Sequence, residues 1–61
     1  MPYVNVQMLA GRSIEQKREL AKEITDSLAK ICNAKPEGVY VVIEDVEKEN
    51  WAVGGTLAAD K

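Results

Sequence analysis

The chain of 61 residues is predicted to be an α+β protein: a β-α-β unit with two parallel strands, one long helix and a short C-terminal hairpin. Two β-branched stretches flank a long stretch of helical periodicity, and a Gly-Gly pair follows near the C-terminus. A strand–helix–strand connection of this kind joins parallel strands and is almost always right-handed. Residues 1–61 contain no linker, repeat or low-complexity tract, so a single domain is predicted.

The first strand is predicted over Tyr3–Leu9, where apolar and more polar residues alternate with a period of two. Val4, Val6 and Met8 form one apolar face of this strand. The residues that alternate with them are Tyr3, Asn5, Gln7 and Leu9. Gly11 then ends the pattern.

A helix of about 20 residues is predicted to begin at Ser13, because Ser13 and Gln16 have the spacing of a capping box. Its apolar positions recur every three or four residues; they are Leu20, Ala21, Ile24, Leu28, Ile31 and Cys32. The charged residues form a predicted solvated face; they are Lys17, Arg18, Glu19, Lys22, Glu23, Asp26 and Lys30. Asn33, Pro36 and Gly38 are expected to end the helix, and Cys32 is expected to be a packed, inert thiol.

The second strand is predicted over Val39–Ile43, with a weaker continuation to Val46. A run that is apolar on both faces indicates a strand buried on both sides, as in parallel sheets. Two strands and one helix cannot cover both faces, so other copies of the chain are expected to complete the core. Gly54 and Gly55 predict a tight turn or hairpin, and Trp51 before them is either a core side chain or a pocket wall.

Size and composition narrow the function classes. The chain has 8 Lys and Arg against 10 Asp and Glu, no His and one Cys, so its net charge is −2. A core this small needs support, yet one Cys cannot form an internal disulfide and the missing His disfavours a zinc site, which leaves oligomerisation. The acidic balance and scarce aromatics argue against nucleic-acid binding, and no apolar stretch is long enough to span a membrane. The absence of a signal-peptide pattern and the single free Cys favour a cytoplasmic location.

Without His, neither a Ser-His-Asp nor a Cys-His site is possible, which directs attention to the N-terminus. Removal of Met1 would leave Pro2 with a free secondary amine at the start of the first strand. Such an amine can act as a general base if desolvation or a nearby cation lowers its pKa. Arg12, in the loop after the first strand, could bind a carboxylate through two hydrogen bonds. Taken alone, each residue also fits a role without function, as a common second residue and as a surface arginine.

Four segments together resemble the 4-oxalocrotonate tautomerase family of the tautomerase superfamily. They are Met1–Val6, Leu9–Ser13, Glu15–Lys17 and the aromatic-x-hydrophobic-Gly-Gly segment Trp51–Gly55. The resemblance covers essentially the whole chain. It implies the tautomerase β-α-β fold, a homo-oligomer built as a hexamer (a trimer of dimers), and a pocket assembled across subunits. It also implies chemistry without a metal or organic cofactor, and a small enol or 2-oxo carboxylic acid as the partner.

The resemblance implies a role for each site residue. Pro2 would be the general base that moves a proton between the enol oxygen and carbon. Arg12 would bind the substrate carboxylate, Trp51 would stand for the family's aromatic pocket wall, and Leu9 would line the pocket. Tyr40 falls where the family has a second arginine, so weaker activity on the dicarboxylate 2-hydroxymuconate is expected.

The expected function is therefore an isomerase that interconverts the enol and keto forms of a 2-oxo acid. Two alternatives stay open: other proline-dependent chemistry on the same scaffold, such as dehalogenation or hydration, and a non-catalytic hexameric homologue. If Met1 is retained, the nitrogen of Pro2 is an amide and cannot act as a base. The functional protein is expected to begin at Pro2, and the missing arginine could also come from a different subunit in a hetero-oligomer.

Overall fold

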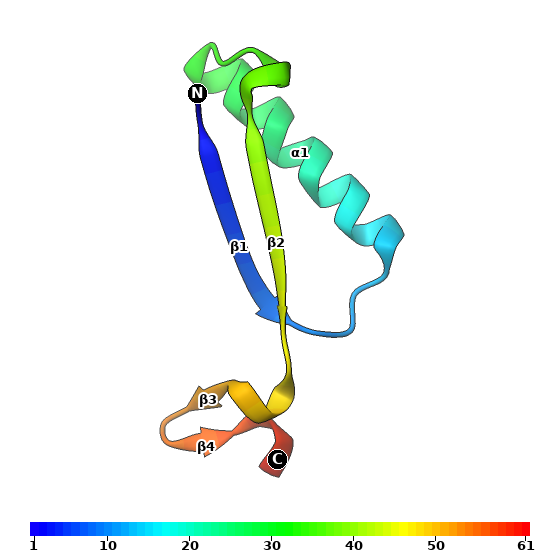
Figure 1. Cartoon of the computed structure of the whole chain (residues 1–61), viewed down its shortest axis with the longest axis vertical. Coiled ribbons are helices and arrows are strands. Elements are labelled where there is room, and N and C mark those ends of the chain that lie inside the picture. The colour runs from blue at the N-terminus through cyan, green and yellow to red at the C-terminus, as the bar shows by residue number, and fades with distance from the viewer.

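The fold is a β-α-β unit followed by a small hairpin, as the computed structural model of residues 1–61 shows (Figure 1). The strands β1 (Tyr3–Leu9) and β2 (Tyr40–Val46) pair in parallel, with Tyr3 opposite Tyr40 and Leu9 opposite Val46. The helix α1 (Ile14–Cys32) makes the crossover between them. The predicted fold class and the bounds of the first strand are confirmed, whereas the second strand begins at Tyr40 and continues fully to Val46.

Local hydrogen bonds define both ends of α1. The backbone N–H of Gln16 donates to Oγ of Ser13 over 3.1 Å, and the backbone N–H of Ser13 donates to Oε1 of Gln16 over 2.9 Å. This is the predicted capping box, which satisfies donors that the first helical turn leaves free. At the other end, Asn33 takes the left-handed conformation with φ of 57°, as residues that end helices often do.

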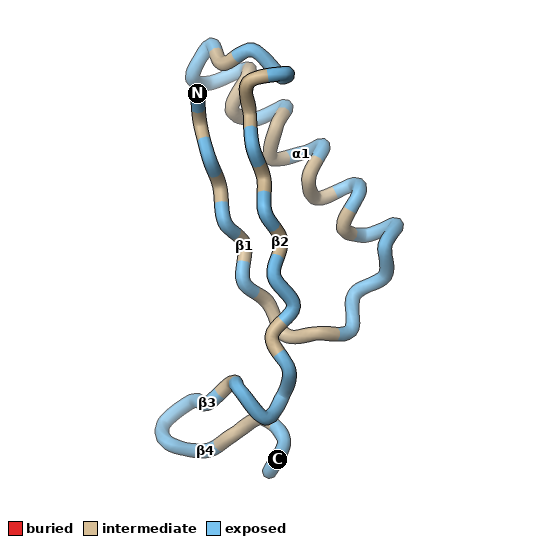
Figure 2. The backbone as a smooth tube through the Cα atoms, in the orientation of Figure 1, coloured by how far each residue is buried: buried red, intermediate tan, exposed pale blue.

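The helix covers one face of the two-stranded sheet and leaves the other face open. Along both strands, partly covered and exposed residues alternate (Figure 2). On the open face, Tyr3 is 63% exposed, Tyr40 is 53% exposed and Val42 is 40% exposed. One chain therefore covers β2 on one side only, as expected for two strands and one helix, because a single helix can pack against only one face.

The C-terminal hairpin consists of β3 (Ala52–Val53) and β4 (Thr56–Leu57), paired antiparallel as predicted. Gly54 and Gly55 both have positive φ, at 60° and 85°, which suits the primed turns that match the twist of a hairpin. Strand β4 packs against the short 3₁₀ turn Lys48–Asn50, which in turn contacts the 3₁₀ turn Ala58–Asp60 of the same segment. It therefore projects beyond the end of β2 (Figure 1).

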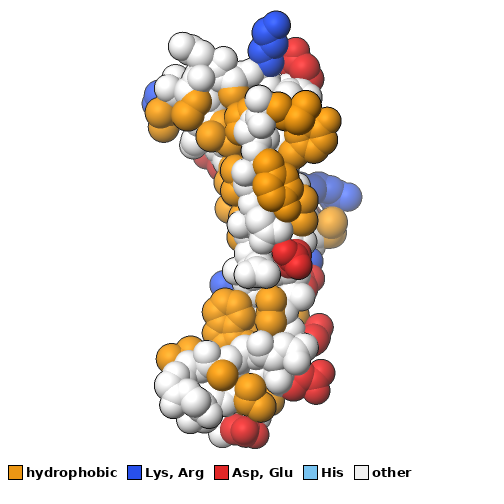
Figure 3. Space-filling view, turned by 60° about the vertical axis from the view of Figure 1, so that its left-hand side comes forward, with side chains coloured by type: hydrophobic (Ala, Val, Ile, Leu, Met, Phe, Trp, Pro, Cys, Tyr) orange, Lys and Arg blue, Asp and Glu red, His pale blue; other side chains and the backbone are white.

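No residue of the single chain is fully buried. The accessible surface is 4749 Å², against about 3,900 Å² expected for a compact monomer of this mass. The radius of gyration is 14.5 Å, against about 10.5 Å expected for this length. Hydrophobic side chains lie exposed in two groups, over the upper part of the molecule and over its lower end (Figure 3). One chain thus forms an extended body with an incomplete core.

Two expectations about the helix surface need correction or comment. Cys32 is exposed rather than packed, because the last turn of α1 directs Ile31 and Cys32 to solvent while Leu28 stays partly covered. On the solvated face, Nζ of Lys22 lies 2.8 Å from Asp26, and this hydrogen bond raises the pKa of Lys22 above its usual value. The helix α1 is not long and apolar enough to cross a membrane.

The capping box predicts a measurable stability difference. Ser13→Ala removes the acceptor for the backbone N–H of Gln16, so the free energy of unfolding should fall by about 1 kcal/mol. Urea denaturation at one fixed protein concentration measures this change. The matched control is Ser27→Ala, on the exposed surface in the middle of α1, where alanine should be neutral or stabilising. Equal effects of the two substitutions would contradict the capping role.

Candidate active site

One group of predicted site residues lies where both strands of the sheet begin. The backbone N–H of Tyr40 donates to the carbonyl of Pro2 over 3.0 Å, which fixes Pro2 beside the first residue of β2. Pro2 is half-buried, whereas Met1 is 92% exposed. The side chains of Tyr3 and Tyr40 are register partners on the open face next to it. Loss of Met1 would therefore leave an amine at the start of the sheet, next to the first residue pair of the two strands.

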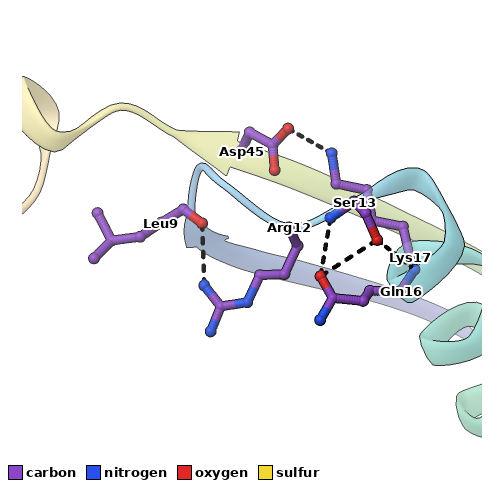
Figure 4. Close-up of polar contacts among 6 residues, drawn as sticks. All are labelled: Leu9, Arg12, Ser13, Gln16, Lys17 and Asp45. Carbon is purple, nitrogen blue, oxygen red and sulfur yellow. Dashed lines mark hydrogen bonds and ion pairs between the residues drawn. The ribbon is translucent and has the colours of Figure 1, made fainter.

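A second group lies where the strands end. Nη1 of Arg12 donates to the carbonyl of Leu9 over 3.3 Å (Figure 4). A guanidinium carries five N–H donors, so this bond leaves most of them available for a carboxylate. Gly11 has φ of 133°, a conformation that other residues rarely adopt, and it turns the chain so that Arg12 follows the strand directly. Arg12 is exposed.

A hollow of about 220 Å³ lies beside Arg12. It is lined by Met8, Arg12, Gln16, Lys17 and Leu20. Among the site residues predicted from the sequence, this hollow includes only Arg12. Helical spacing could have shown that Gln16 and Leu20 lie on the same side of α1. Their position next to Arg12 depends on how α1 packs against the sheet, which the sequence does not reveal.

Lys17 is not part of the solvated helix face, contrary to prediction. Its Nζ lies 2.6 Å from Oδ2 of Asp45 on β2, and its side chain is only 25% exposed. The long side chain of Lys17 reaches from the first turns of α1 to Asp45 near the end of β2, so a residue that helical periodicity assigned to solvent meets the sheet instead (Figure 4). Lys17 therefore stands in the wall of the hollow, next to Arg12.

The two groups are far apart within one chain. The seven residues of β1 separate Pro2 from the Arg12 loop by about 23 Å, at a rise of about 3.3 Å per residue. Trp51 lies beyond the end of β2, half-buried, with its carbonyl accepting a hydrogen bond from Ala58 over 2.7 Å. Trp51 therefore lies beyond the same end of the sheet as Arg12. The structure brings Pro2 to Tyr40 and Leu9 to Arg12, but it does not unite the five predicted residues.

The acidic side chains are dispersed, and no three of the Cys, Asp and Glu residues come together as metal ligands. One carboxylate lies between the two ends of the sheet, on its open face. There Nδ2 of Asn5 donates to Glu44 over 2.7 Å and to Oη of Tyr3 over 3.3 Å. This polar group interrupts an otherwise largely uncharged surface of the sheet.

Comparison with known proteins identifies the family to which the chain belongs. Residues 2–61 match the family model described as "Tautomerase enzyme". A curated relative from Bacillus cereus, named "Probable tautomerase", is 44% identical over 61 residues and is matched over the full length of both chains. The chain belongs to the tautomerase family.

Two solved structures agree with this assignment. A homologue of 4-oxalocrotonate tautomerase has a TM-score of 0.95 and 36% identity, and the match covers 100% of this chain and 97% of that one. A heterohexameric 4-oxalocrotonate tautomerase from Chloroflexus aurantiacus has a TM-score of 0.92 and 35% identity, with coverage of 98% and 97%. The resemblance to the 4-oxalocrotonate tautomerase family noted from the sequence is confirmed.

Proposed function

We propose that the chain is a cofactor-independent isomerase of the 4-oxalocrotonate tautomerase type, which interconverts the enol and keto forms of a 2-oxo acid. The observation that carries the proposal is the half-buried Pro2 at the start of β1, in a chain whose family match begins at that residue. Arg12, with most of its donors open, supplies the complementary group for a carboxylate. The free thiol of Cys32 supports a location in the reducing cytoplasm.

In this proposal the secondary amine of Pro2, freed of Met1, acts as the general base. It takes the proton from the enol oxygen and returns it to carbon, so that the substrate becomes the keto form. A general base transfers protons best when its pKa lies near the working pH, and desolvation within an assembled site would favour the neutral amine over the charged ammonium. The Arg12 guanidinium holds the carboxylate of the substrate through paired, charge-assisted hydrogen bonds.

A complete site requires more than one chain. Pro2 and Tyr40 lie at one end of the sheet, while Leu9, Arg12 and Trp51 lie at or beyond the other, about 23 Å away. We propose that Pro2 of one subunit meets Arg12 of another within a homohexamer built as a trimer of dimers. The open face of the sheet and the projecting hairpin supply the apolar surface for that assembly. The Chloroflexus relative is a heterohexamer, so assembly of this chain with a second type of subunit is the alternative to a homohexamer.

Tyr40 sets a limit on the substrate. It stands where the resemblance places a second arginine, and a tyrosine hydroxyl can donate one hydrogen bond but carries no positive charge. Electrostatic stabilisation of a developing dienolate is often the largest catalytic contribution. The absence of a positive charge at position 40 should therefore lower the rate most for a dianionic substrate. Enol acids with a single carboxylate are therefore proposed as better substrates than 2-hydroxymuconate.

The proline mechanism predicts that Pro2→Ala lowers the rate of ketonisation by about 10²–10⁴-fold, because a general base contributes that much. The reaction is followed by ultraviolet absorbance with 2-hydroxymuconate and enol phenylpyruvate. Intact mass must first establish that Met1 is absent from the assayed wild type, and protein that retains Met1 serves as a second inactive sample. Equal rates for wild type and Pro2→Ala would exclude the mechanism. A processed wild type that turns over neither enol acid would favour the non-catalytic homologue.

The shared site predicts that two inactive variants restore activity when they assemble together. Pro2→Ala and Arg12→Ala are unfolded together in equal amounts and refolded, and the rate is compared with each variant refolded alone. If each site takes Pro2 from one chain and Arg12 from another, about one site in four is intact by random assembly. Recovery of roughly a quarter of wild-type activity is expected. Recovery of none would place both residues of a site in the same chain.

The role of Tyr40 predicts a change in substrate preference. Tyr40→Arg should raise kcat/KM for 2-hydroxymuconate about tenfold relative to enol phenylpyruvate, because it adds a charged donor for a second carboxylate. The control is Tyr40→Phe, which removes the hydroxyl without adding charge and should leave the preference for a single carboxylate in place. A parallel change for both substrates in Tyr40→Arg would show that position 40 does not contact the second carboxylate.

A further inference from the structure

Asp45 is a carboxylate on the helix-facing side of the sheet. It lies opposite Met8 in the register and follows Val41 and Ile43 on the same face of β2. Those neighbours are apolar, so a charge at this position needs a partner. Its partner is Lys17, whose Nζ lies 2.6 Å from Oδ2 of Asp45, with the two side chains 25% and 38% exposed. This pair is better covered than the Lys22–Asp26 pair on the helix surface, at 72% and 56%.

The pair changes the charge that the hollow presents. Two cations line the hollow, Arg12 and Lys17. Lys17 is neutralised by Asp45, whereas Arg12 donates only to a neutral carbonyl, that of Leu9. Arg12 is therefore the one cation in the wall whose charge no carboxylate of the chain offsets. With Asp45 in place, the hollow offers one unpaired cation, Arg12, and can therefore bind one carboxylate strongly rather than two.

The loop that carries Arg12 is already fixed by other bonds. The backbone N–H of Ala10 donates to the carbonyl of Val46 over 2.9 Å, which ties the end of β1 to the end of β2. The capping box between Ser13 and Gln16 holds the start of α1 (Figure 4). The Lys17–Asp45 pair is therefore not needed to close this loop, and its distinct consequence is the masking of a charge.

We infer that Asp45 is a positioning residue that sets substrate specificity: it holds and neutralises Lys17, so that the site selects enol acids with one carboxylate over dicarboxylates. The inference rests on the proposed function, in which Arg12 binds the substrate carboxylate. This effect adds to that of Tyr40. At one end of the sheet Tyr40 carries no positive charge, and at the other end Arg12 is the one cation that Asp45 does not neutralise. Release of Lys17 would give the hollow an additional anchor for a dianion.

The test compares two ligands that share one carbon skeleton, trans,trans-muconate with two carboxylates and sorbate with one. Their dissociation constants are measured by calorimetry or by NMR titration of the assembled protein. For wild type, sorbate should bind more tightly than muconate. Asp45→Asn, which keeps the shape of the side chain, should favour muconate over sorbate by about three- to tenfold, because an unmasked ammonium then reaches the second carboxylate.

Three further variants decide between masking and other effects. Asp45→Asn with Lys17→Met should return the ratio of the two affinities to the wild-type value. Lys17→Met alone leaves the Asp45 carboxylate without its partner, so it should weaken the binding of muconate relative to sorbate, and a shift toward muconate in this variant would overturn the inference. Asp26→Asn is the matched control, because it frees Lys22 on the far, solvated part of the helix. A similar shift in Asp26→Asn would reduce the effect to net charge and overturn the inference as well.

The readout also separates this inference from the proposed function. Binding needs no turnover, so a wild type that binds these ligands but isomerises no enol acid would end the proposed function and still report on Asp45. An unchanged ratio in Asp45→Asn, equal weakening of both ligands, or no binding of either ligand would each overturn the role of Asp45.

Discussion

A two-stranded sheet covered by one helix has one face without a partner, and this open face explains the shape of the chain and the placement of its candidate site residues. The face toward α1 forms what core the chain possesses, while Tyr3, Tyr40 and Val42 lie on the uncovered side. The accessible surface and the radius of gyration both exceed what a compact chain of this size would have. Because so little apolar surface is buried, association with other copies is the physical route to a stable fold.

The same geometry determines how a site can be built. A parallel pair places the beginnings of both strands at one end and their ends at the other, so Pro2 meets Tyr40 while Leu9 lies beside the Arg12 loop. No movement within one chain brings these groups together across the length of β1. An assembly that covers the open face and also joins opposite ends of neighbouring sheets would provide stability and chemistry through the same contacts. Stability and activity are then expected to depend on protein concentration together.

The charges near Arg12 refine what such a site selects. A tautomerase has no need of a metal to move a proton next to a carbonyl, provided that a base of suitable pKa and a carboxylate anchor face each other. In this chain the anchor at the end of the sheet has a neighbour, Lys17, whose charge Asp45 offsets. At the other end, Tyr40 offers a hydroxyl in place of a cation. If Arg12 and Tyr40 contact the substrate as proposed, both features favour a substrate with one carboxylate, although each acts through different residues.

Local patterns in the amino-acid sequence were enough to predict the helix and strands, since these elements depend on interactions between near neighbours. Alternation predicted β1, the Ser13–Gln16 spacing predicted the start of α1, and Gly54-Gly55 predicted the hairpin turn. The sequence also identified Pro2 and Arg12 as candidates from their residue types and places. The folded chain was needed to show that Cys32 is exposed, that Lys17 contacts Asp45, and that the candidate residues lie in two separate groups. These facts follow from the packing of α1 against the sheet and from the parallel pairing of β1 with β2, which join residues far apart in the sequence and which no local pattern encodes.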